Sequence, residues 1–291
     1  MRGECHAHMI MDGATYQKAG VQHADGVRDE IIRTRLKLYQ DAGITFVRDG
    51  GDALGVSSRA AELAQEFGID YRTPAFAIHK EGHYGKIVGK SWSDLKEFHQ
   101  RVLEAKALGA DFIKIMTTGI LDFGTHGEIT GEPLDAEEVR EMVHIAHEEG
   151  FAVMSHTNGS YGVRAAIEAG VDSLEHGNYM DDETIEMLAE SNTVWVPTLV
   201  TVRNLIGCGR YDDSTIRPIA DHAHKAVVLA FEKGAKIAPG SDAGAYMVPH
   251  ADGLKNEYQA FEQILGEKED VYQRLEQGME EIRRRFRHPR S

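Results

Sequence analysis

Short apolar or β-branched stretches alternate with longer amphipathic stretches along the whole chain. The short stretches have turn residues nearby and are typical of buried strands. They predict strands at residues 4–9, 44–48, 73–78, 112–116, 152–156, 172–176, 193–198 and 236–240. The amphipathic stretches predict helices at residues 27–42, 53–67, 93–108, 136–149, 161–169, 182–190, 217–233 and 254–265. Six of these helices are closely followed by a glycine, which can take the left-handed backbone conformation that ends a helix.

Eight strand–helix units in series indicate a parallel sheet, and eight is the number that closes such a sheet into a (β/α)8 TIM barrel. The sequence shows no linker, no low-complexity segment and no repeat beyond this alternation. We therefore expect one α/β domain over residues 1–291, with the barrel at residues 4–266 and a helical tail at residues 267–291. In such a barrel the active site forms at the carboxyl ends of the strands.

Composition and charge narrow the classes of function. Hydrophobic residues make up 42% of the 291 residues, which is enough for a large core, and Lys+Arg 32 against Asp+Glu 47 gives a net charge of −15. This charge disfavours nucleic acid and anionic membranes as partners. The two cysteines, Cys5 and Cys208, indicate no disulfide framework. Because no stretch has the length of a membrane span or the pattern of a signal peptide, we expect a soluble cytoplasmic protein.

Polar side chains gather at the ends of five predicted strands. Side chains two residues apart on a strand point to the same face, so His6 and His8 can converge on one point. Convergent imidazoles are typical ligands of divalent metal ions. The other strand ends bring Lys114, His156, His176 and Asp242 to the same barrel mouth. The sequence therefore predicts a metal site at this mouth.

This residue set resembles the metal site of the amidohydrolase superfamily. The surrounding sequence motifs are similar to those of its imidazolonepropionase and metal-dependent prolidase branch. They are GITFVRD at residues 43–49, DFIKIMTTG at residues 111–119, AAIEAGVDSLEHG at residues 165–177, PTL at residues 197–199 and GSDAG at residues 240–244. The resemblance spans roughly residues 4–266 in the order of the family, so the match is specific.

The resemblance implies a site for two divalent metal ions. His6, His8 and Asp242 would bind the first ion, and His156 and His176 would bind the second. Zinc is favoured by ligation that is rich in histidine, and manganese, iron or cobalt could also serve.

Lys114 and Asp242 have further roles by the same resemblance. Lys114 would be carboxylated by CO2 and would bridge the two ions, which is chemically reasonable because burial favours the neutral amine that can add CO2. A hydroxide shared by the ions would attack the carbonyl carbon, and Asp242 would carry its proton to the leaving group. The implied enzyme is a metal-dependent amidohydrolase that cleaves an amide, peptide or cyclic amide C–N bond of a small molecule.

The chain departs from its relatives at both ends of the barrel. Many relatives carry a small β-sandwich built from residues before the first strand and after the last helix. Here three residues precede the first predicted strand, and the ~25 residues after the eighth helix show no strand pattern. We expect the sandwich to be absent and the sheet end to be covered by the tail or by another subunit of a homo-oligomer. In addition, Glu4 stands where relatives usually have aspartate.

Three loop residues are candidates for substrate contact. His83 follows the third predicted strand, at a point where relatives have a Gly-His-Gly motif. Tyr179 follows the sixth predicted strand, and Arg203 follows the seventh. Each could equally be a loop residue that packs on its neighbours. Arg48 and Asp49, at the end of the second strand, are expected to form a structural ion pair.

Three alternatives remain open. The stretch around Lys114 also resembles the Schiff-base lysine of deoxyribose-phosphate-type aldolases, whose chemistry needs a buried lysine of lowered pKa. A second alternative is a deaminase of the same superfamily with one metal ion, which would need no lysine bridge. A third is a relative without catalytic activity, although such proteins usually lose ligands and here all six positions are filled.

Overall fold

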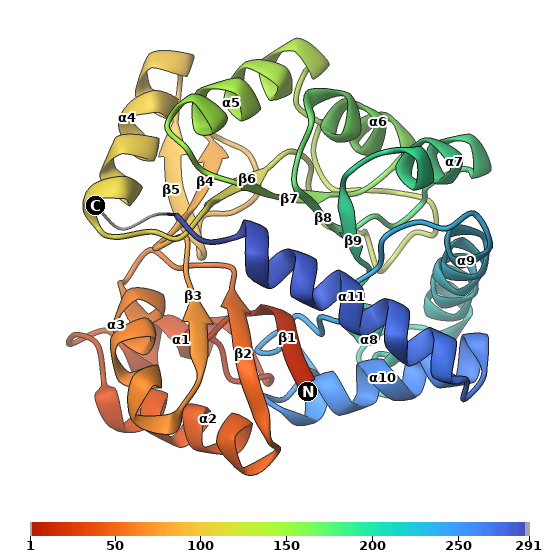
Figure 1. Ribbon diagram of the computed structural model, residues 1–291, viewed down its shortest axis with the longest axis horizontal. Helices are drawn as coiled ribbons and strands as arrows, with labels where there is room; N and C mark the ends of the chain where they lie inside the picture. The colour runs from red at the N-terminus through yellow and green to blue at the C-terminus, as the bar shows by residue number, and fades with distance from the viewer. Residues whose placement is uncertain (1, 289–291) are drawn as a thin grey trace.

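Parallel strands and the helices that follow them form the framework of the protein (Figure 1). The computed structural model describes residues 2–288. The strands are β1 (Arg2–Ala7), β2 (Ile44–Asp49), β3 (Asp70–Arg72), β4 (Ala77–Lys80), β5 (Gly89–Trp92), β6 (Ile113–Met116), β7 (Val153–Thr157), β8 (Ser173–His176) and β9 (Val194–Val196). The helices are α1 (Tyr16–Gln22), α2 (Asp29–Asp41), α3 (Val56–Leu63), the 3-10 helix η1 (Ala64–Phe67), α4 (Leu95–Ala107), α5 (Ala136–Glu148), α6 (Ser160–Ala169), α7 (Asp182–Glu190), α8 (Val200–Arg203), α9 (Asp213–Glu232), α10 (Asp252–Leu265) and α11 (Glu269–Arg285). Within residues 2–288, no helix is both long enough and apolar enough to span a bilayer.

All strand pairs in the two sheets are parallel. One sheet has the order β1-β2-β3, and the other has the order β5-β4-β6-β7-β8-β9. Two isolated parallel bridges, Trp195↔Ile237 and Ala7↔Ala243, place the segment 237–243 between β9 and β1. The result is an α/β fold with parallel sheets, consistent with the predicted (β/α)8 TIM barrel.

The predicted bounds of the third strand, residues 73–78, are wrong. The structure has two shorter strands there, β3 and β4, and only β4 overlaps the predicted range. Pro74 interrupts the strand because it has no N–H for the ladder, and Ala75 has a φ of 63°. β3 pairs with β2 and β4 pairs with β6, while the N–H of Asp111 donates to the oxygen of Thr73 at 2.8 Å. This bond connects the two sheets on the side away from residues 237–243.

The eighth predicted strand, residues 236–240, also departs from regular structure. It contributes bridges rather than a continuous ladder, since Pro239 offers only its carbonyl, which accepts from the N–H of Cys5 at 3.1 Å. The structure adds β5, α1 and α8, which the hydrophobic pattern did not predict.

The helices cover the outer faces of the strands, and four of them begin after an aspartate. Asp94, Asp135, Asp181 and Asp212 each accept a backbone N–H at the start of α4, α5, α7 and α9. The apolar faces of these helices join the largest buried cluster, with residues of β4, β6, β7, β8 and β9. A second cluster joins β1, β2 and β3 to α2, α3 and α10. The helices thus leave the carboxyl ends of the strands free to build a site.

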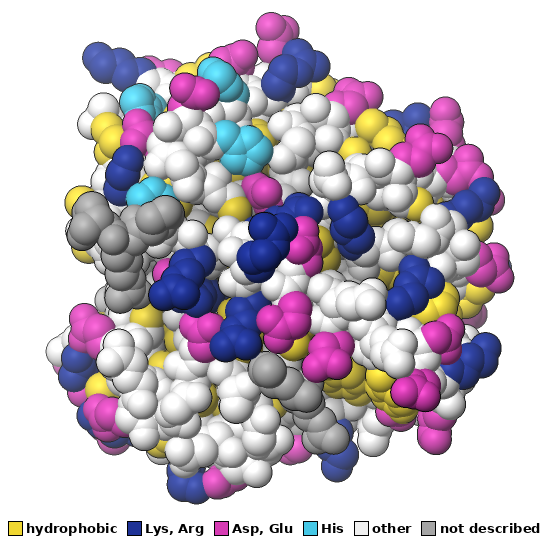
Figure 2. Space-filling view, in the orientation of Figure 1, with side chains coloured by type: hydrophobic (Ala, Val, Ile, Leu, Met, Phe, Trp, Pro, Cys, Tyr) yellow, Lys and Arg dark blue, Asp and Glu magenta, His cyan; other side chains and the backbone are white. Residues whose placement is uncertain are grey.

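Helix α11 covers the opposite end of the barrel. It crosses the barrel in Figure 1, and its Met279 and Ile282, with Phe286 directly after it, join a buried cluster with residues near the amino ends of the strands. Gly278 allows this approach, because a Cβ there would lie 2.1 Å from the oxygen of Ile237. On the same face, basic and acidic side chains are interspersed (Figure 2). Of the two covers expected from the sequence, the helical tail is the one that the structure provides.

Candidate metal centre

The six residues predicted as ligands come together at the carboxyl ends of the strands. They lie in or directly after β1, β6, β7 and β8 and in the segment 237–243. One cavity of about 810 Å³ is lined by all of them: His6, His8, Lys114, His156, His176 and Asp242. The topology therefore brings together side chains that are far apart in the sequence.

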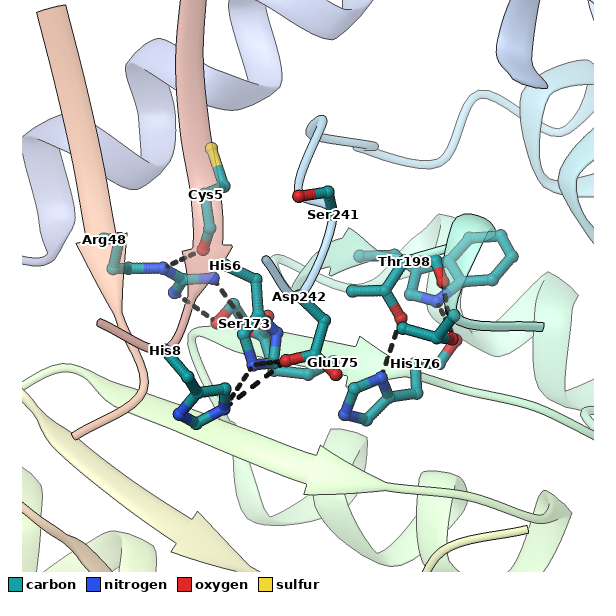
Figure 3. Close-up of polar contacts among 12 residues, drawn as sticks. Cys5, His6, His8, Arg48, Ser173, Glu175, His176, Thr198, Ser241 and Asp242 are labelled. Atoms are coloured by element: carbon teal, nitrogen blue, oxygen red, sulfur yellow. Dashed lines mark hydrogen bonds and ion pairs between the residues drawn. The ribbon is translucent and has the colours of Figure 1, made fainter. Parts of the chain in front are cut away.

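His6, His8 and Asp242 form a tight group of ligand atoms (Figure 3). The Nε2 atoms of His6 and His8 lie 3.4 Å apart, and Oδ1 of Asp242 lies 3.5 Å from the first and 3.4 Å from the second. Ligand atoms that surround a zinc ion tetrahedrally at about 2.1 Å are themselves separated by about 3.4 Å. The three atoms thus have the spacing that a tetrahedral divalent ion requires.

His156 and His176 face this group from the neighbouring strands. Their ring centroids are 4.6 Å apart, and the ring centroid of His176 lies 5.2 Å from that of His6. Nε2 of His156 lies 3.1 Å from the oxygen of Gly119, so it donates there and leaves Nδ1 free. Nδ1 of His176 lies 2.7 Å from Oγ1 of Thr198, which leaves Nε2 free. Each ring therefore has one nitrogen held by the protein and one available to a metal ion.

Lys114 is buried in the same cavity, with 1% of its surface exposed. Its Nζ has no hydrogen-bond partner among the described residues. Burial lowers the pKa of this amine to about 8, since desolvation disfavours the ammonium form. A neutral amine is thereby accessible near neutral pH.

Burial also sets the charge of the other ligand residues. It lowers the pKa of His156 to about 3 and lowers the pKa values of His6 and His176 well below their ordinary value. Neutral imidazole is the form that binds metal ions. Burial raises the pKa of Asp242, so its carboxylate takes up a proton more readily than an exposed aspartate.

A comparison with known families agrees with this geometry. Residues 27–265 match the profile of the Amidohydrolase family. This chain belongs to the amidohydrolase family. The resemblance noted in the sequence is thereby confirmed.

Individual relatives of this amidohydrolase match over part of its length. Ochratoxinase from Aspergillus niger is 31% identical over 139 residues, which cover 46% of this chain and 29% of the relative. An uncharacterised protein from Mycobacterium tuberculosis is 32% identical over 120 residues, which cover 39% of this chain and 32% of the relative. The matched segments therefore span about a third of the length of these curated relatives.

Solved structures share the fold over nearly the whole chain. A Xaa-Pro dipeptidase with bound methionine in its active site has a TM-score of 0.72 and 24% identity, covering 96% of this amidohydrolase and 74% of that chain. The crystal structure of A. niger ochratoxinase has a TM-score of 0.72 and 22% identity, covering 96% and 68%. Its structural neighbours thus include enzymes of the prolidase-like branch, which the sequence motifs indicated.

Glu4 has a structural function in this amidohydrolase, at the position where the family resemblance led us to expect aspartate. Its carboxylate accepts from the N–H of His6 at 3.1 Å, and from the N–H and the hydroxyl of Ser241 at 2.8 and 2.6 Å. Burial raises the pKa of Glu4 to about 7. The longer side chain therefore ties β1 to the loop that carries Asp242.

The predicted ion pair between Arg48 and Asp49 is wrong. Adjacent residues of a strand point to opposite faces, so the two side chains diverge. Arg48 points into the barrel, where it contacts Glu175 at 2.9 Å and Ser173 at 2.7 Å. Asp49 instead accepts from backbone N–H groups and from the hydroxyl of Tyr71 at 2.7 Å.

The three candidate substrate residues lie in different surroundings. His83 lines the cavity, as does its neighbour Tyr84. Tyr179 does not line it; its hydroxyl accepts from the N–H of Gly127 at 2.8 Å. Arg203 also lies outside the lining, where its guanidinium binds the side chain of Gln263. The lining of this cavity thus includes His83 but neither Tyr179 nor Arg203, and the contact of these residues with a substrate stays a prediction.

The cavity wall contains candidate substrate-contact residues that were not predicted from the sequence. Much of the wall is apolar, with side chains from loops after several strands, including Ile10, Leu54, Ile87, Leu121, Phe123, Leu205, Tyr211 and Tyr246. Lys86 and Arg210 add positive charge, and Asp242 is the only acidic residue among the lining residues of the described chain. No sequence signal could have found this set, since its members share neither spacing nor motif.

Proposed function

We propose that this protein is a metal-dependent amidohydrolase that cleaves an amide, peptide or cyclic amide C–N bond of a small molecule. The observation that carries the proposal is the spacing of 3.4–3.5 Å among Nε2 of His6, Nε2 of His8 and Oδ1 of Asp242. This group lies at the base of a cavity in a member of the amidohydrolase family.

The residues fit a pair of divalent metal ions. His6, His8 and Asp242 would hold one ion, and His156 and His176 would hold the other. Such ions supply a hydroxide at neutral pH and polarise the substrate carbonyl. Zinc suits the histidine-rich ligand set best.

Lys114 would join the two sites as a carbamate formed from CO2. The neutral amine that this reaction needs is favoured by the pKa of about 8. The same residue could support an aldolase through a Schiff base, but membership of the amidohydrolase family and the surrounding imidazoles support the carbamate.

Asp242 would move the proton. Its carboxylate would accept the proton of the attacking water and deliver it to the departing amine. Because burial raises the pKa of Asp242, the proton can reside on this residue between the two transfers. The apolar wall would exclude bulk water and bind the apolar parts of the substrate.

The wall also supports a class of substrate. Its side chains suit an apolar group, and Lys86 and Arg210 suit a carboxylate. N-acyl amino acids and dipeptides have both features. The structural likeness to a Xaa-Pro dipeptidase supports dipeptides as members of this class.

The test is metal analysis combined with a screen of dipeptides and N-acyl amino acids in buffer with bicarbonate. We expect two metal ions per chain and hydrolysis that a chelator abolishes. One metal ion per chain with ammonia release from a nucleobase would indicate the deaminase, and borohydride trapping of an aldehyde on Lys114 would indicate the aldolase.

The variant Asp242→Asn tests the proton transfer. The amide keeps an oxygen that can bind metal but cannot accept the proton, so we expect bound metal and a kcat lower by about 10²–10⁴-fold. Metal content and kcat are measured on the same preparation, and a turnover near that of the original protein would refute the role of Asp242.

A further inference from the structure

A chain of buried polar contacts lies beneath the candidate metal centre (Figure 3). Nδ1 of His6 lies 2.8 Å from Oε2 of Glu175. The other oxygen of Glu175 accepts from the guanidinium of Arg48 at 2.9 Å and from the hydroxyl of Ser173 at 2.6 Å. His6, Glu175 and Arg48 are each at most 1% exposed. The contacts therefore form in an interior that excludes water.

We propose that Glu175 is a positioning residue that fixes His6 in the tautomer with its proton on Nδ1, and that Arg48 holds the Glu175 carboxylate in place for this task. The inference rests on the proposed metal-dependent function. It assigns roles to two residues that do not themselves bind metal or substrate.

The tautomer follows from the donor and acceptor properties of the two groups. A carboxylate only accepts hydrogen bonds, whereas a neutral imidazole has one donor and one acceptor nitrogen. Nδ1 of His6 and Oε2 of Glu175 have no other hydrogen-bond partner among the described residues. The proton of His6 therefore lies on Nδ1, and the lone pair on Nε2 points towards His8 and Asp242.

Arg48 supplies the charge that makes a buried carboxylate acceptable at this point. A buried carboxylate without a partner carries a large desolvation penalty. The guanidinium of Arg48 also donates to the oxygen of Cys5 in β1 at 2.7 Å, and it lies 4.4 Å from the ring centroid of Phe286, the residue that follows α11. Contacts from β1, β2 and the end of α11 thus hold Arg48 in place, and Arg48 restrains the carboxylate that orients His6.

His6 differs in this respect from two other candidate ligands. His176 is held by the hydroxyl of Thr198, and His156 is held by the carbonyl of Gly119, so both partners are neutral. A carboxylate partner makes the imidazole a stronger electron donor to the metal ion. We therefore expect His6 to depend on its partner more than these two residues do.

The variant Glu175→Gln tests the inference directly. Its amide oxygen can keep the bonds from Arg48 and Ser173, while its NH2 group would face Nδ1 of His6. We expect the His6 proton to move to Nε2 and metal binding to weaken by about 10–100-fold. Imidazole ¹⁵N NMR of the metal-free protein reports the tautomer, and competition with a chromophoric chelator reports the metal affinity.

A matched control is Glu257→Gln, which replaces another buried carboxylate. Glu257 accepts from the N–H groups of Leu199 and Val200, each at 2.9 Å, and does not line the cavity. We expect the control to keep the metal affinity and the His6 tautomer of the original protein.

The outcomes separate this inference from the proposed function. If the original protein binds no metal, the proposed function fails. If it binds two ions and Glu175→Gln is folded with unchanged affinity, only the inference is overturned. If the variant does not fold, the ¹⁵N spectrum of the original protein decides, because a His6 proton on Nε2 would overturn the inference and a proton on Nδ1 would support it.

Discussion

His8 owes its position to a close approach of the backbone. The residue opposite its ring is Gly50, where a Cβ would lie 2.3 Å from Cε1 of the imidazole. Nδ1 of His8 has no hydrogen-bond partner among the described residues. On its Nδ1 side the ring is therefore placed by the space beside Gly50 and not by a polar contact, in contrast to His6.

Gly50→Ala should displace His8 from the metal site. The added methyl group cannot share space with the ring, so we expect metal affinity to fall by about 10–100-fold, as for other losses of ligand orientation. Equilibrium dialysis measures the change. Gly20→Ala is the control, because a Cβ at this exposed glycine has no neighbour within 4 Å; equal affinities of the two variants would contradict the prediction.

At the scale of elements, two candidate ligands lie at the ends of strand segments and have a left-handed backbone conformation, which sets the direction of their side chains. His176 and Asp242 have φ values of 67° and 61°, which are rare for residues other than glycine. Such strain persists when the surroundings hold it, and it clusters at functional sites. The loop after Asp242 is held in turn by His250, which joins it to two other elements.

His250 makes the packing of these elements sensitive to pH. Its Nδ1 lies 3.0 Å from the hydroxyl of Tyr39 in α2, and its Nε2 lies 2.8 Å from the oxygen of Met11, after β1. Burial lowers the pKa of His250 to about 3. The folded protein therefore keeps this imidazole neutral, whereas the unfolded chain binds a proton below pH ~6.5.

The free energy of unfolding should therefore fall as the pH falls from about 6.5 towards 3. The contribution of His250 is at most about 1.4 kcal/mol per pH unit. In His250→Gln this contribution is absent, so we expect a shallower fall between pH 7 and pH 5, measured by urea unfolding. Identical pH slopes for the two proteins would show that His250 does not titrate in this way.

At the scale of the whole molecule, the two ends of the barrel have different tasks. Helix α11 covers the amino ends with apolar side chains, and the carboxyl ends hold the six candidate ligands. These ligands come from four strands and from the segment 237–243. Metal ions bound there would strengthen the connection of the segment 237–243 to β1, which otherwise rests on an isolated bridge and a few backbone hydrogen bonds. The homo-oligomer expected from the sequence stays a prediction, and light scattering can test it by measuring the molar mass in solution.

Metal removal should consequently lower the stability of the entire barrel. A ligand that binds only the folded state stabilises it by about 4 kcal/mol when its free concentration is 1,000 times Kd. We expect a chelator to lower Tm by several degrees, and added metal to restore it, in scanning calorimetry. The control is the same chelator saturated with metal; an unchanged Tm after proven metal loss would contradict the prediction.

Much of this architecture could be predicted from the sequence because its determinants are local. The alternation of apolar and amphipathic stretches, with glycines after the helices, indicated parallel strands and helices. The prediction failed at Pro74 and Pro239, where missing N–H groups break the ladder inside stretches of otherwise correct hydrophobicity. The candidate ligands could be predicted because each lies in or just after a predicted strand, and Lys114, His176 and Asp242 also lie within sequence motifs that resemble those of the family.

The sequence by itself determined the kinds of element, their order and the six residues that meet at one mouth, since periodicity and strand ends are properties of neighbouring positions. Only the tertiary structure decided that Arg48 reaches Glu175 and not Asp49, that Tyr179 and Arg203 lie outside the cavity, and that α11 covers the far end. These contacts join residues distant in the chain, and their geometry depends on how the strands close around one interior.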